Sequence, residues 1–212
     1  YGRESGRLTV REPSLEFKHL VDLAPFFDDY ERLTEMAEDL VAMDQDITGR
    51  CGREHDRCAG TPIRLSLAEA VYVAHSMDAE LTSAKRLEVI DRAVAVARKE
   101  RRTAKDVVGP DSEAGADACL FDADAICPLQ EDGCLLYGHR PLQCRTFELA
   151  EGQKTEFWEN VLAPRLHKLS QELFFAFSGE FAPRSMSFAL PDVVSGRYVQ
   201  TFFHHLMAIS GK

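Results

Sequence analysis

Apolar residues recur at three- and four-residue steps along much of the chain, which is the spacing of a helix with one buried face. The helix predicted over 154–178 is expected to bend near Pro164, because proline has no amide hydrogen to donate to the preceding turn. No internal repeat is present, and an alternating strand pattern occurs only in short pieces. The helices that the pattern predicts span residues 26–46, 67–76, 83–105, 154–178 and 192–209. The sequence therefore predicts a mostly α fold.

Local signals refine two of these helices. Ser66 and Glu69 have the spacing of a capping box, in which the serine caps the first turn and the glutamate reaches back to it. The helix over 83–105 is expected to bury the apolar face formed by Leu87, Ile90, Val94 and Ala97. Near the C-terminus, core packing is the interpretation favoured for a group of phenylalanines, with a partner-binding or dimer surface as the alternative: Phe174, Phe175, Phe177, Phe181 and Phe188.

Between the predicted helices lie two irregular segments, a polar loop over 47–64 and a stretch rich in glycine and proline over 106–145. No long linker separates the helices, so we expect one domain over 14–212 after a flexible N-terminal segment, 1–13.

The formal charge of −10 argues against a nucleic-acid partner. No stretch reaches the roughly 18 apolar residues of a membrane span. A cytoplasmic protein with reduced thiols is the expectation.

Six cysteines in 212 residues are far fewer than a disulfide scaffold carries. They occupy positions Cys51, Cys58, Cys119, Cys127, Cys134 and Cys144. No C-x-x-C pair occurs, which argues against a thioredoxin-like redox pair, an ordinary zinc ribbon and a bacterial ferredoxin motif. Thiolates are soft ligands that select zinc, copper(I) or iron–sulfur clusters. A shared metal would also explain how a long irregular region stays ordered.

The segment over 127–147 resembles the downstream motif of the CxxCxxCC, or YkgJ-like, family of zinc- or iron-chelating cysteine-cluster proteins. The matching positions are Cys127, Pro128, Cys134, Tyr137, Arg140, Pro141, Cys144, Arg145 and Phe147. The upstream motif of the family aligns its outer cysteines with Cys51 and Cys58, followed by a short strand-like stretch and the helix that Ser66 caps. The resemblance covers about 48–150 of the chain.

This sequence departs from the family at the two inner upstream cysteines, where it has Glu54 and Arg57. Cys119 has no clear counterpart and is a further candidate ligand, with a spare thiol or a small buried hydrophobic side chain as the alternatives. Glu54 or His55 is an alternative ligand in place of a lost thiolate, although solvent exposure is the commoner fate of such side chains. The resemblance implies one centre held by four of the cysteines, since a second site would lack ligands.

A [4Fe-4S] cluster is favoured over zinc, because zinc prefers closely spaced cysteine pairs that this chain lacks. Arg140 and Arg145 are expected to offset the thiolate charge and to donate hydrogen bonds near the centre. The predicted function is that of a metal-binding protein in electron transfer, redox sensing or an accessory role, acting with a protein partner. The alternatives are a zinc-stabilised interaction module and a protein-modifying, methylase-like enzyme, although the sequence has no recognised catalytic motif and no nucleotide-binding motif.

Overall fold

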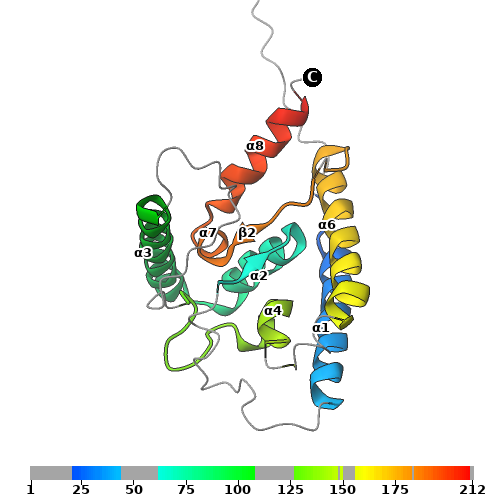
Figure 1. Ribbon diagram of the computed structural model, residues 1–212, viewed down its shortest axis with the longest axis horizontal. Coiled ribbons are helices and arrows are strands. Elements are labelled where there is room, and N and C mark those ends of the chain that lie inside the picture. Colours follow the sequence, from blue (N-terminus) through cyan, green and yellow to red (C-terminus); the bar gives the residue numbers. More distant parts are fainter. Residues whose placement is uncertain are drawn as a thin grey trace, which may run out of the picture.

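The computed structural model describes residues 21–43, 62–107, 127–147, 149, 156–182 and 184–210, and within these ranges the fold is mostly helical (Figure 1). The longer helices are α1 (Ala24–Met43), α2 (Leu67–Glu80), α3 (Ser83–Val107), α6 (Ala163–Ser178) and α8 (Tyr198–Ser210). The shorter elements are β1 (Arg64–Leu65), η2 (Tyr137–His139), α4 (Leu142–Arg145), η3 (Trp158–Leu162), β2 (Phe188–Ala189) and α7 (Leu190–Val194).

Helix α2 occupies the middle of the fold and contacts α1, α3, α6 and α7 (Figure 1). Its predicted capping box is confirmed. The Ser66 hydroxyl accepts the Glu69 amide at 3.3 Å, and the Glu69 carboxylate accepts the Ser66 amide at 2.9 Å. Glu69 is only 1% exposed, so this cap lies inside the protein rather than on its surface. The start of α2 is therefore a buried polar point next to the hydrophobic core.

Helices α1 and α6 pack side by side along one edge of the fold (Figure 1). Just before α6, the helix widens into the π-helical turn η3. Pro164 has no amide hydrogen to bond the carbonyl of Asn160, so the irregularity expected near this proline takes the form of a wide turn. The apolar stripe of α6 is buried against the core: Leu166, Leu169, Leu173 and Phe174.

The buried face of α3 differs from the predicted one. Leu87 is 64% exposed, whereas Val89, Ala93 and Ala97 are buried. These three residues recur at four-residue steps, and α3 makes its main contacts with α7. Small side chains along this stripe allow the two helices to approach closely. The predicted face was therefore wrong at Leu87, whereas Ala97 is buried and Ile90 is partly buried against the core, as predicted.

The single C-terminal helix of the prediction is in fact two helices, α7 and α8. Gly196 separates them with a φ of 76°, a left-handed backbone conformation that favours glycine. The amide of Gly196 bonds the Val193 carbonyl at 3.0 Å and closes the end of α7. The chain can therefore turn sharply between two stretches that share one apolar periodicity.

The strands β1 and β2 form a short antiparallel pair in which Arg64 faces Ala189 and Leu65 faces Phe188.

Among the C-terminal phenylalanines, Phe174 and Phe188 are buried, as expected for core residues. The other phenylalanines of this group contradict that expectation, since their exposed fractions are 47% at Phe175, 40% at Phe177 and 63% at Phe181. Among the described helices, none has the length and apolar character that a bilayer crossing requires.

Candidate metal centre

The structure describes half of the predicted ligand set. Cys127, Cys134 and Cys144 lie within the described residues, where the first two are half-buried and the third is buried. These three thiols are not joined to one another by a disulfide. The other candidates lie outside the described residues: Cys51, Cys58 and Cys119, with the alternative ligands Glu54 and His55. Their positions relative to the described thiols stay a prediction.

A tight hairpin connects Cys127 to Cys134. The Gln130 amide bonds the Cys127 carbonyl at 3.0 Å, and the Leu135 amide bonds the Leu129 carbonyl at 2.9 Å. Gln130 pairs with Cys134 in an isolated β-bridge, and Gly133 between them has a φ of 148°. Backbone bonds thus close the path between the first two thiols, and the positive φ explains the glycine. Arg92 of α3 adds a hydrogen bond to the Gln130 carbonyl at 3.3 Å.

Cys144 lies on the short helix α4, which packs against α1. The first residue of α4, Leu142, donates its amide to the Glu69 carboxylate at 3.2 Å. Glu69 also holds the Ser66 amide, so one buried carboxylate joins the start of α2 to the start of α4. The upstream and downstream parts of the resembling segment therefore meet at Glu69. Burial raises the pKa of this carboxyl, and the hydrogen bonds from Ser66 and Leu142 counteract part of that rise.

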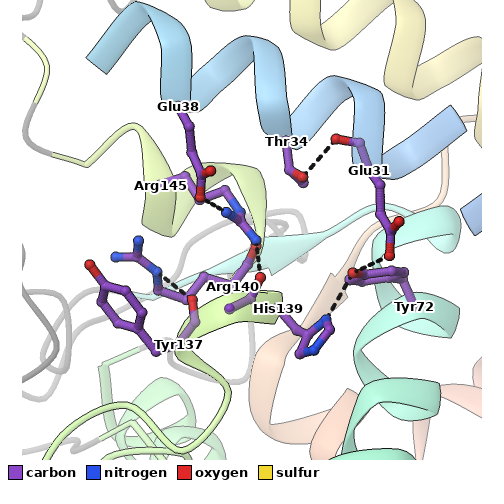
Figure 2. A network of polar contacts seen from close by, with 9 residues as sticks. Glu31, Thr34, Glu38, Tyr72, Tyr137, His139, Arg140 and Arg145 are labelled. Atoms are coloured by element: carbon purple, nitrogen blue, oxygen red, sulfur yellow. Dashed lines mark hydrogen bonds and ion pairs between the residues drawn. The ribbon is translucent and has the colours of Figure 1, made fainter. Parts of the chain in front are cut away.

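Arg145 ties the loop before α4 to helix α1. Its guanidinium donates to the carbonyl of Arg140 at 2.8 Å, to the carbonyl of Gly138 and to the carboxylate of Glu38 (Figure 2). Its side chain is only 4% exposed. Arg145 thus holds the 138–140 loop in place through charge-assisted hydrogen bonds. Its predicted contact with the thiolates stays a prediction.

Arg140 lies over the ring of Tyr137, with its guanidinium carbon 3.9 Å from the ring centroid. Its Nε donates to the Tyr137 carbonyl at 3.0 Å (Figure 2). The pair is a cation–π contact between two motif positions. The motif residues that are not cysteines therefore shape the loop that carries the cysteines.

A second polar chain next to the loop was missed from the sequence. The Tyr72 hydroxyl donates to Glu31 Oε1 at 3.0 Å and lies 2.9 Å from His139 Nδ1 (Figure 2). Since the tyrosine hydrogen goes to Glu31, His139 donates its Nδ1 hydrogen to the tyrosine oxygen. Nε2 then lies 3.5 Å from Glu80 Oε1, an ion pair when the ring is protonated. Burial is the main reason why the pKa of Tyr72 rises to about 12, and the hydrogen bond to the negatively charged Glu31 is the second.

Removing the Tyr72 hydroxyl breaks this chain at its centre. We expect Tyr72→Phe to lower the free energy of unfolding by about 1 kcal/mol, because the half-buried ring of His139 and the carboxylate of Glu31 lose their shared partner. Urea unfolding measures the change, and a double-mutant cycle with Glu31→Ala isolates the coupling. Additive effects of the two substitutions would show that the Tyr72–Glu31 contact contributes nothing to stability.

An open cavity of about 570 Å³ borders the cysteine hairpin. Cys134 lies in its wall together with the carboxylates of Glu80, Glu131 and Asp132. Lys85 pairs with Glu131 at 3.0 Å and neutralises one of these charges. The remaining negative potential disfavours anionic ligands beside Cys134 and favours cationic groups.

Within the described ranges, no group of three or more histidine, cysteine or acidic side chains is arranged to hold a metal ion. The donor type at positions 127, 134 and 144 fits zinc or an iron–sulfur cluster, both of which take thiolates. Only three of the six cysteines are described, so four thiolates on one centre would need at least one cysteine from outside the described ranges. No family model matches the chain, and comparisons with curated proteins and with solved structures give no match. The family resemblance therefore rests on the cysteine motif.

Proposed function

We propose that this protein binds one metal centre through cysteine thiolates, with an iron–sulfur cluster favoured over a zinc ion. The ligands would be four of the six cysteines, drawn from the described hairpin and α4 and from Cys51, Cys58 and Cys119. Such a centre supplies one-electron redox chemistry when it is an iron–sulfur cluster. The role we infer is electron transfer, redox sensing or an accessory function for a protein partner.

The observation that carries this proposal is the way in which the cysteine segment is held. Cys127 and Cys134 sit on a hairpin closed by backbone bonds, and Cys144 sits on a helix fixed by Glu69. Arg145 connects the intervening loop to α1. A loop held by its own polar contacts presents thiolates with little loss of entropy on binding, which favours affinity.

The three described cysteines are expected to contribute more to metal binding than Cys119 does. Replacing each of them by serine therefore tests the ligand assignment. We expect Cys127→Ser, Cys134→Ser and Cys144→Ser each to lose most of the bound metal and to unfold at lower temperature, because metal binding energy is folding energy. Cys119→Ser should have a milder effect. Metal-to-protein ratios from elemental analysis, with circular dichroism to confirm folding, measure both effects.

Serine is nearly isosteric with cysteine, so each folded variant reports on the ligand rather than on packing. A folded Cys134→Ser protein that keeps the full metal content would remove Cys134 from the ligand set. Equal losses in Cys119→Ser and Cys144→Ser would instead promote Cys119 to a ligand. Unchanged metal content in all four variants would contradict cysteine ligation as a whole.

A further inference from the structure

Helix α8 carries two apolar stripes, and only one of them faces the core. Tyr198, Phe202 and Leu206 pack against the buried residues. Phe202 meets Phe174 with ring centroids 5.6 Å apart, and Tyr198 meets Phe188 at 5.7 Å. These contacts fix the helix on the body of the protein, so its other faces have a defined orientation.

The second stripe lies one residue further along and faces away from these contacts. Its members are Val199, Phe203 and Met207, with exposed fractions of 39%, 56% and 70%. Phe177 of α6 extends this surface, since it is 40% exposed and its ring lies 5.7 Å from that of Phe202, which in turn lies 6.1 Å from Phe203. We call these four residues the α8 face. Large apolar side chains gathered on one exposed face are typical of an interaction surface.

The absence of acidic and basic residues from α8 limits the kinds of partner that the α8 face can bind. Residues 198–210 contain no aspartate, glutamate, lysine or arginine, in a chain with 25 basic and 35 acidic residues. Helices that lie on membrane surfaces are usually rich in lysine and arginine on their polar side, and a nucleic-acid contact also needs positive charge. The α8 face therefore fits an uncharged apolar protein surface.

A second copy of this chain offers such a surface. Two molecules of charge −10 repel each other, and the repulsion is weakest where the contact itself is free of charge. The stripe is also symmetric about Phe203, because Val199 and Met207 lie four residues to either side. In an antiparallel pair of helices about a two-fold axis, Phe203 meets its own copy and Val199 meets Met207, as a self-complementary contact requires.

We propose that α8 forms the contact of a homodimer, with the two copies of Phe203 at its centre. The full chain should sediment with twice its mass of 23.8 kDa at micromolar concentration and dissociate on dilution. Phe203→Glu places two carboxylates against each other at the two-fold axis. It should weaken the dimer by about 30-fold or more, the scale of a central hot spot. Circular dichroism should stay unchanged, because Phe203 is 56% exposed in the monomer. The unfolding temperature should match that of the natural chain diluted until it is monomeric.

Leu87→Glu is the matched control, since Leu87 is 64% exposed on α3, outside the α8 face. It should leave the dimer intact. A protein that stays monomeric at all concentrations up to about 100 μM would overturn the proposal. A dimer that Phe203→Glu does not weaken would overturn it as well. Binding of a monomeric protein to neutral phosphatidylcholine vesicles, lost in Phe203→Glu, would assign the face to a membrane instead.

Discussion

Glu69→Ala is expected to lower the free energy of unfolding by about 3 kcal/mol, because it leaves one buried and one half-buried backbone amide without an acceptor. The amides are those of Ser66 and Leu142, at 2.9 Å and 3.2 Å from the carboxylate. One substitution therefore removes the carboxylate half of the α2 capping box and the contact that holds the start of α4, which carries Cys144. Chemical unfolding of the two proteins measures the loss. Glu88→Ala is the control, since Glu88 is 61% exposed and should change stability by less than about 0.5 kcal/mol.

The same carboxyl has a pH signature. Burial raises the pKa of Glu69 above its unfolded value of 4.5. The folded state therefore takes up a proton at a higher pH than the unfolded state does. The associated stabilisation is complete below about pH 4.5 and is lost as the pH rises through the folded pKa. Subtracting the stability of Glu69→Gln from that of the natural chain should give a difference that falls with rising pH above 4.5. A pH-independent difference would show that Glu69 has the same pKa in both states.

Arg145→Met should destabilise the protein by a similar amount, about 3 kcal/mol, because it removes three charge-assisted contacts from a buried side chain. The carbonyls of Gly138 and Arg140 lose their donor, and Glu38 loses its ion pair. Methionine keeps most of the apolar volume, so the change reports on the polar contacts. Thermal and urea unfolding measure the loss.

Arg32→Met provides the comparison for Arg145. Arg32 pairs with Asp29 at 2.6 Å on the surface, where its side chain is 71% exposed. Exposed pairs contribute at most about 1 kcal/mol, so this variant should unfold close to the natural chain. If both arginine variants unfold alike, Arg145 does not hold the loop as the hydrogen bonds indicate. Glu38→Gln should lie between the two, since Glu38 is 55% exposed.

The fold could be predicted where the signal is local. The Ser66–Glu69 capping box depends on a three-residue spacing, and the start of its helix was correctly placed, although the helix ends at Glu80 rather than near Ser76. The break at Gly196 was missed, because a single glycine within a continuous apolar pattern gives no indication of whether the backbone turns there. The face of α3 was misjudged because burial at Val89 and Ala93 depends on α7, a partner nearly one hundred residues away in the sequence.

The candidate site shows the same division between local and distant signals. The motif pointed to Arg140 and Arg145 as residues of interest, and the structure gives them partners in the cysteine-bearing loop. The link between Glu69 and Leu142 spans 73 positions, and that between Tyr72 and His139 spans 67. No spacing rule connects residues so far apart. A buried glutamate within a capping box is ordinary in sequence, and its second role becomes visible only when α4 lies against it.

The most direct test of metal binding is the content of iron, acid-labile sulfide and zinc in the natural chain after anaerobic purification. A bound cluster predicts about four iron and four sulfide per chain, with a brown colour. About one zinc per chain in a colourless protein would identify the other cysteine-ligated form. A folded protein that contains neither metal, and that takes up neither after incubation with ferrous iron and sulfide or with zinc, would contradict the proposed function.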